Sequence, residues 1–330
     1  MLDNEVKFGR KAMPINNSDA VCDHELIAGC DFGAPQSAGQ QAKKIIYIEA
    51  RRVAARHYVV SHEGRNQRLF TDWSAGGTWQ SRRRGWTVDE LRLSLSSGQR
   101  PAVLAFDFPF SIAQGLLESD DFAAAVGQDK FCTRDKFVKY VSSKLNSSFE
   151  NNKASACIRG LDSFSAWRSQ SFWALRSTDR AANAQPPLKH IYQNLFSMTL
   201  LGNSMLAELE TSGFGLNLDG HPFQSGLPEI IETYPRLVAK SVGVSDSYKR
   251  TTRHSMGLIL RFLAERSISI QWSERVVNFC ENYRSAENDP DGMDALFCLV
   301  TAIAHREGRS RPVNPHENSN ADEGVIFAPS

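Results

Sequence analysis

The sequence has little of what would place it in a specialised class of protein. Its six cysteines are scattered and form no C-x-x-C pair, which argues against a zinc ribbon or a disulfide framework and predicts reduced thiols. No stretch approaches the roughly 20 apolar residues of a membrane span. The N-terminal segment contains no apolar core of a signal peptide. We therefore expect a soluble, cytoplasmic protein with no membrane partner.

Charge of one sign is also lacking overall, since the formal net charge of +1 is too small to indicate a polyanionic partner. The basic residues are nevertheless unevenly distributed: the segment from Lys43 to Arg100 contains twelve lysines and arginines but only five acidic residues. This segment predicts either a solvated basic surface or one that binds a nucleic-acid backbone, with Arg51 and Arg52 as candidate phosphate contacts. Three later basic residues are candidates for the same role: Lys249, Arg250 and Arg253.

Apolar residues are present in sufficient number for a substantial core, because 41% of the 330 residues are hydrophobic and 10% are aromatic. Residues 1–24 are polar and without periodicity, so we expect a tail or loosely packed lead-in, followed by one domain over residues 25–330. The first half of that domain predicts three strands, a helix and a strand, in the segments Leu26–Asp31, KKIIYIEA, ARHYVVSHE, Thr87–Gly98 and AVLAFD.

The middle of the chain has a different pattern. From about residue 111 to 226 we expect a mainly helical insertion, with polar loops between its helices. The helices are expected around Lys136–Leu145, Phe172–Arg176 and Leu188–Leu209.

The sheet is expected to resume at Glu229–Thr233 and to be followed by a helix at Arg253–Arg266. A last helix has the clearest signals, with Asp289 as N-cap, Pro290 at the first helical position and Gly308 as the stop. The sequence therefore predicts an α/β protein with a mixed sheet flanked by helices.

Acidic residues recur at the ends of the predicted strands. Asp31 closes the first apolar strand, Asp107 closes the fourth, and Glu232 lies inside the later one. Strand alternation makes each acid share a face with buried or partly buried neighbours. On the last helix, Asp291 and Asp294 are three residues apart and lie on one face. A buried cluster of carboxylates is costly unless a cation compensates it, so these acids predict a metal site.

Each acid also fits a structural role when it is considered alone: Asp31 as a turn cap, Glu232 as the ion-pair partner of Arg236. Considered together they favour Mg²⁺ or Mn²⁺, which accept a few carboxylates and complete their coordination with water and phosphate oxygens. Two such ions, roughly 4 Å apart, activate water and stabilise the leaving oxygen of a phosphodiester. The chemistry expected of this pattern is metal-dependent phosphodiester hydrolysis.

The same stretches resemble a known family, the domain-of-unknown-function 429 family of predicted nucleases. The matching segments occur in the family's order from about residue 26 to the C-terminus: AGCDFGAPQSAGQQAKKIIYIEA, AFDFPFSI, IIETYPRLVAKSVG, DPDGMDALFCLVTAIAHREG and EGVIFAP. The resemblance implies a ribonuclease H-like fold and nuclease activity. It also implies that Asp31, Asp107 and Glu232 are strand-borne metal ligands and that Asp294 is the helix-borne ligand, all four being catalytic, with Asp291 as an accessory ligand.

Two alternatives stay open. The first is a non-catalytic module of the same fold that binds metal or nucleic acid without turnover. The second is an actin-like phosphotransferase, which shares the strand order, although the sequence has no G-x-x-x-x-G-K-[ST] motif and no second Asp-x-Gly strand opening. Loss of metal-dependent product on substitution of Asp31 would separate an enzyme from a binding module.

Overall fold

The computed structural model describes residues 25–33, 45–61, 63–67, 85–146, 160–190, 195–221, 223, 226–244, 252–273, 291–313 and 321–330. The predicted lead-in of residues 1–24 lies outside these ranges. So do Asp289 and Pro290 at the predicted start of the last helix, and the candidate phosphate contacts Lys249 and Arg250.

The centre of the described structure is a nine-stranded mixed sheet in the order β7-β3-β2-β1-β4-β6-β9-β8, with β5 paired to β6. Strand β2 is antiparallel to both β1 and β3, whereas β4, β6 and β9 continue from β1 in parallel. The strands are β1 (Glu25–Phe32), β2 (Ile45–Ala54), β3 (His57–Val60), β4 (Pro101–Asp107), β5 (Gly215–Leu216), β6 (Glu229–Thr233), β7 (Ser269–Trp272), β8 (Ser310–Pro312) and β9 (Ile326–Pro329).

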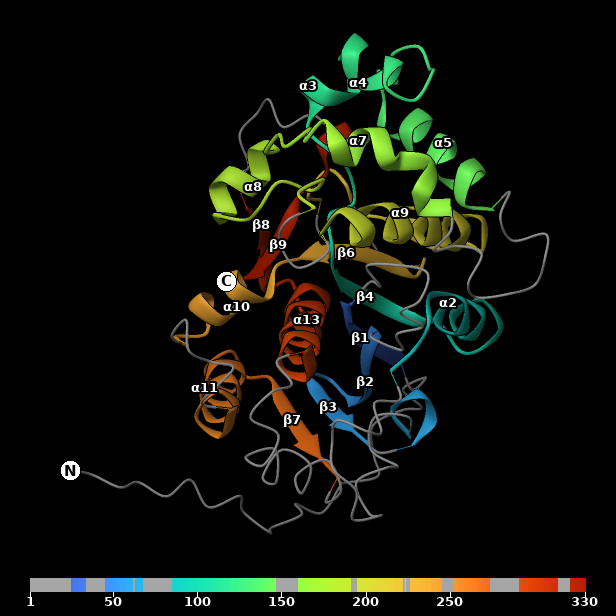
Figure 1. Ribbon diagram of the computed structural model, residues 1–330. Helices are drawn as coiled ribbons and strands as arrows, with labels where there is room; N and C mark the ends of the chain where they lie inside the picture. The colour runs from blue at the N-terminus through green and yellow to red at the C-terminus, as the bar shows by residue number, and fades with distance from the viewer. Residues whose placement is uncertain are drawn as a thin grey trace, which may run out of the picture.

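Helices cover both faces of this sheet (Figure 1). One core lies between the sheet and the helices α2 (Val88–Ser97), α3 (Gln114–Leu117), α4 (Asp120–Ala124), α5 (Arg134–Asn146), α7 (Ser165–Ser169) and α9 (Leu195–Thr211). The other core lies against α10 (Pro235–Ser241), α11 (Thr252–Glu265) and α13 (Asp291–Arg306). Helix α8 (Ser177–Ala182) and the short 3-10 helices η1 (Gly64–Asn66), η5 (Leu161–Phe164) and η8 (Ala321–Glu323) complete the fold. Within the described ranges, every helix is too short or too polar to span a membrane.

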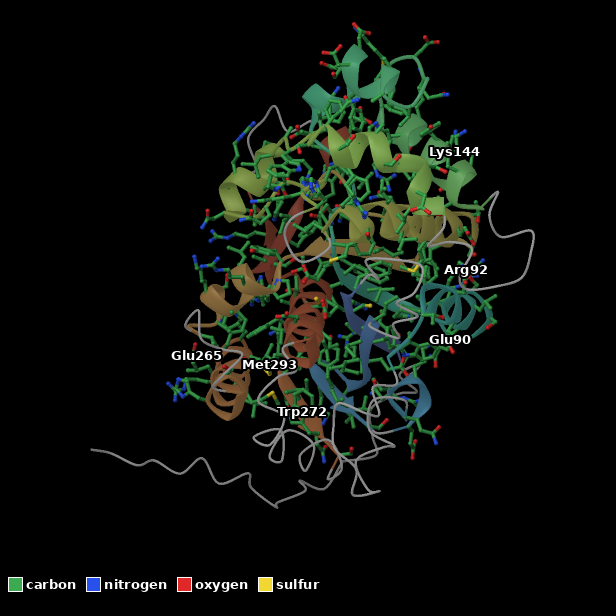
Figure 2. All side chains as sticks on the ribbon, viewed as in Figure 1. Glu90, Arg92, Lys144, Glu265, Trp272 and Met293 are labelled. Atoms are coloured by element: carbon green, nitrogen blue, oxygen red, sulfur yellow. The ribbon has the colours of Figure 1, made fainter. Side chains whose placement is uncertain are left out.

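The predicted order of three strands, a helix and a strand is confirmed by β1, β2, β3, α2 and β4. The N-cap of α2 is Thr87. The Thr87 hydroxyl accepts a hydrogen bond from the Glu90 N–H at 3.2 Å, and the Glu90 carboxylate accepts one from the Thr87 N–H at 3.0 Å (Figure 2 labels Glu90). Strand β6 has the predicted bounds, and Gly308 follows α13 with a positive φ of 65°.

The prediction of a helix at Phe172–Arg176 is wrong. Ser171 adopts a left-handed φ of 55° after α7, and Arg176 is extended as the N-cap of α8, so the helix begins only at Ser177. Arg176 is held in this extended conformation because its backbone N–H donates to the Asp179 carboxylate at 3.0 Å. The side chain of Arg176 also pairs with Glu232, 56 residues away, as described below.

Gly29 sets the distance between the sheet and α13. A Cβ at this position would lie 2.0 Å from the backbone nitrogen of Leu299 and 2.6 Å from the carbonyl oxygen of Ala295. The helix backbone therefore rests directly on β1, and only glycine permits this approach. The consequence for the site is that side chains of α13 reach the end of β1.

Gly29→Ala is expected to lower the free energy of unfolding by about 2–3 kcal/mol, because the added methyl group overpacks a contact made by backbone atoms. Gly257→Ala is the matched control. Gly257 lies inside α11 with no atom within 4 Å of an added Cβ, so alanine there is expected to stabilise by up to about 1 kcal/mol. Urea unfolding of both variants checks the prediction, and equal stability of Gly29→Ala and wild type would contradict it.

Candidate metal centre

Two of the predicted ligands are neighbours across the parallel pair β1 and β4. Asp31 is in register with Asp107, as Gly29 is with Ala105 two residues earlier. Alternation places both carboxylates on the face of the sheet that packs against α13, together with Ile27. Both acids come at the carboxyl ends of their strands, where open α/β sheets bind their ligands.

Asp294 completes the group from α13. Asp31, Asp107 and Asp294 each offer a carboxylate oxygen, and these oxygens all lie within 4.8 Å of one another. Asp31 and Asp294 are buried, with 7% and 6% of their surface exposed, and Asp107 is half-buried. We call this group the aspartate triad. Three carboxylates this close repel one another, and a cation offsets the repulsion.

The carboxylates of the triad affect the pKa of neighbouring titratable groups. Burial raises the pKa of the Cys30 and Cys298 thiols, and the charges of Asp31 and Asp107 raise them further. Burial also raises the pKa of Tyr234, and the charge of Asp107 adds to this effect, while the charge of Arg236 and a hydrogen bond with it oppose the effect. Burial is the main cause of all three shifts, and the carboxylates of the triad add to them in the same direction.

Glu232 is not part of the triad. On β6 it is in register with Phe106 rather than with Asp107, so its side chain points to the opposite face of the sheet. Thr233, the next residue, faces α13 instead and its hydroxyl hydrogen-bonds that of Thr301 at 3.1 Å. The expectation that Glu232 lies beside Asp31 and Asp107 does not agree with this register.

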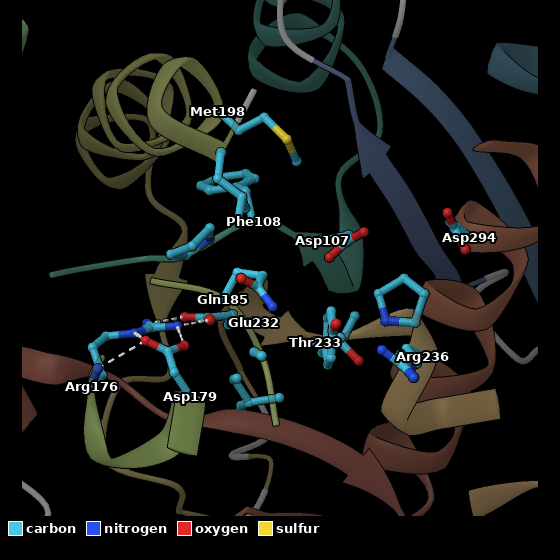
Figure 3. Close-up of a pocket in the computed structure, with 16 residues that line it drawn as sticks. Asp107, Phe108, Arg176, Asp179, Gln185, Met198, Glu232, Thr233, Arg236 and Asp294 are labelled. Carbon is cyan, nitrogen blue, oxygen red and sulfur yellow. Dashed lines mark hydrogen bonds and ion pairs between the residues drawn. The ribbon is translucent and has the colours of Figure 1, made fainter. Parts of the chain in front are cut away.

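Glu232 is instead held in a buried ion-pair network (Figure 3). Arg176 donates to both of its carboxylate oxygens and, on its other side, to both oxygens of Asp179. The Phe110 N–H also donates to Glu232 at 2.9 Å. Burial raises the pKa of Glu232, and Arg176 counteracts that effect. Arg176 and Asp179 were not predicted as site residues, because an acid three residues after an arginine indicates a helix start but does not indicate the pairing of Arg176 with Glu232.

The predicted phosphate contacts are not gathered at the triad. Ile46 is the β2 residue beside Asp31, and Arg52 lies six residues further on, at roughly 3.3 Å per residue about 20 Å away. Arg52 is ion-paired with Glu25 and Glu307 at the far end of the strands. Arg51 is exposed at the same end. For Asp291 and Arg253 the structure describes the backbone only: Asp291 begins α13, and Arg253 lies in the first turn of α11.

A cavity of about 300 Å³ opens beside the triad, at the ends of β4 and β6 (Figure 3). Asp107 and Asp294 form part of its lining, together with Tyr234 and the exposed Arg236. The Arg176 network lies at its polar side, and Gln185 lines it from the segment between α8 and α9. Its apolar wall includes Phe108, Leu195, Met198 and Ile326.

No protein-family model, no curated protein and no solved structure matches this chain. The likeness to the domain-of-unknown-function 429 family therefore rests on the sequence motifs given above, and the site has to be interpreted from its own geometry.

Proposed function

We propose that this protein is a Mg²⁺- or Mn²⁺-dependent hydrolase of phosphodiester bonds, with nucleic acid as its substrate and the aspartate triad as its metal site. The observation that carries the proposal is the convergence of Asp31, Asp107 and Asp294, from two strands and a helix far apart in the sequence, on one point at the edge of a cavity. Capping and helix-dipole effects give a role to each acid alone, but they do not explain why three acids from separate elements converge.

The donor set fits these ions. Carboxylate oxygens are the hard ligands that Mg²⁺ and Mn²⁺ accept, and three of them leave coordination positions for water and for phosphate. A bound divalent ion supplies Lewis-acid activation of a phosphoester and of water near neutral pH. Arg236, at the rim of the same cavity, supplies a positive charge that can orient a phosphate group.

The number of acids at the triad supports one ion held mainly by the protein. A second ion would need a further carboxylate on this face, and among the described residues Glu232, predicted for that position, is held by Arg176 on the other face. We therefore assign Glu232 a positioning role. By accepting from the Phe110 N–H, it fixes the segment that follows Asp107.

The topology supports the ribonuclease H-like part of the proposal. The antiparallel strands β3, β2 and β1 are followed across the sheet by parallel β4 and β6, with acids at the ends of β1 and β4 and a late helix, α13, packed against β1. That is the arrangement expected of a ribonuclease H-like nuclease, the fold that the family resemblance implies.

The test is a cleavage assay of wild-type protein on labelled single-stranded, duplex, hybrid and branched nucleic acids with Mg²⁺ or Mn²⁺. We expect cleavage of at least one substrate, and we expect a chelator to abolish it. If no substrate is cleaved while the metal still binds, the function is that of a binding module, and the hydrolase proposal is wrong.

A further inference from the structure

The cavity beside the triad has two chemically different sides. Asp107, Asp294 and Arg236 make one side charged, whereas Phe108, Leu195 and Met198 make the other apolar. The Phe108 ring is fixed against α9, because a Cβ at Gly202 would lie 2.4 Å from it. A ligand that fits both sides has a flat apolar part joined to a phosphate.

We propose that the cavity receives one unpaired nucleotide of the strand that is cut, so that the substrate is a single-stranded nucleic acid. This inference rests on the proposed function for the position of the scissile phosphate, and on the cavity for the rest. A volume of about 300 Å³ is at the small end of ligand pockets. The cavity has room for one base but not for a base pair, so a duplex has to unpair before one of its bases enters. The free-energy cost of unpairing therefore favours single strands.

Gln185 provides the polar contact that a base edge requires. Its carbonyl oxygen accepts a hydrogen bond from the Lys189 ammonium at 2.7 Å. Its amide NH₂ group makes no hydrogen bond within the described part of the chain and lines the cavity (Figure 3). Side-chain amides pair with base edges in this way.

A stacking surface lies next to this contact. The Lys189 ammonium, which holds Gln185, also lies 5.8 Å from the centre of the Trp173 ring. Trp173 is 37% exposed and is the one aromatic residue among the large apolar side chains exposed in the described ranges. The His190 ring lies beside it, with 5.3 Å between ring centres. An aromatic platform with a cation is the usual means of holding a base of single-stranded nucleic acid.

The contacts Gln185–Lys189–Trp173 therefore form a continuous path from the cavity to the surface. The nucleotide in the cavity presents its phosphate to the triad, and its neighbour stacks on Trp173. Lys189 lies between the two and contributes positive charge for the connecting backbone.

The test is a binding measurement that does not require turnover. Fluorescence anisotropy in Ca²⁺, with gel electrophoresis to show that the oligonucleotides stay intact, gives the affinity for labelled single-stranded DNA and RNA and for the matching duplexes. We expect the single strands to bind at least about tenfold more tightly than the duplexes, and an oligonucleotide without bases to bind weakly. Trp173→Ala and Gln185→Leu are each expected to weaken binding about 5- to 100-fold.

Two further variants separate stacking from a general loss of structure. Trp173→Phe keeps an aromatic ring and is expected to restore most of the affinity. Leu93→Ala removes another exposed apolar side chain, 57% exposed on α2, and is expected to bind like wild type. Duplex binding equal to single-strand binding, wild-type affinity of Trp173→Ala and Gln185→Leu, or no binding of any oligonucleotide would overturn the proposal. Tight single-strand binding without cleavage in Mg²⁺ or Mn²⁺ would refute the hydrolase function and the scissile phosphate with it, and would leave the cavity as a binding site for an unpaired nucleotide.

Discussion

Asp31→Asn and Asp294→Asn are each expected to reduce metal-dependent cleavage by about a thousandfold or more. Each substitution replaces one of only three carboxylates that meet at the metal site. A neutral amide binds a divalent ion more weakly than a carboxylate does. The two remaining carboxylates then no longer hold the ion in the same geometry. A loss of roughly 4 kcal/mol in transition-state stabilisation corresponds to this factor.

Single-turnover rates at saturating metal check this expectation. Asp135→Asn is the matched control, because Asp135 lies on α5, outside the triad, with 77% of its side chain exposed. The control is expected to cleave at the wild-type rate. Both triad variants should fold as wild type does, since an amide occupies nearly the same volume as a carboxylate. Retention of a tenth or more of the wild-type rate by either triad variant would show that the triad is not the metal site.

Arg176→Met is expected to lower the free energy of unfolding by about 3–5 kcal/mol, because it leaves the buried carboxylates of Asp179 and Glu232 without their partner. Arg92→Met is the control. Arg92 forms a partly exposed ion pair with Glu208 at the edge of the molecule (Figure 2), and such pairs contribute at most about 1 kcal/mol. Urea unfolding of the two variants compares the losses, and equal losses would mean that the buried network does not stabilise the fold.

The loss in Arg176→Met is expected to depend on pH. Without the arginine, burial raises the pKa of Glu232 further above its ordinary value of 4.5. The folded variant then binds a proton that the unfolded chain releases, so its stability falls as the pH rises above 4.5. The difference from wild type should therefore be smallest near pH 4.5 and largest at neutral pH. A difference that does not change with pH would show that Glu232 is not the group left uncompensated.

Strand alternation and helix signals were sufficient to predict β1, β4, β6 and most of α13, and with them Asp31, Asp107 and Asp294. They were not sufficient for Glu232. Alternation shows which residues of one strand share a face, but the register between strands decides which faces coincide. On β6 the pairing of Phe106 with Glu232 turns the acid away from the triad.

The distance of Arg51 and Arg52 from the triad could have been predicted from the sequence. If β1 and β2 form an antiparallel pair, each residue further along β2 lies further from Asp31, so a basic pair at the end of β2 belongs to the opposite end of the sheet. Arg176 had no comparable signal. Its partner Glu232 is 56 residues away, and only the folded structure brings them together.

Thermal unfolding of wild type and Asp107→Asn, with and without Mn²⁺, tests the central claim most directly. Mn²⁺ should raise the midpoint of wild type reversibly, since binding at a hundredfold excess over Kd contributes about 2.7 kcal/mol. Asp107→Asn should unfold at a higher temperature than wild type in chelator, because one of three repelling charges is gone, and should gain little from Mn²⁺. An equal Mn²⁺ response of the two proteins, or none in wild type, would contradict the assignment of the aspartate triad as a metal site.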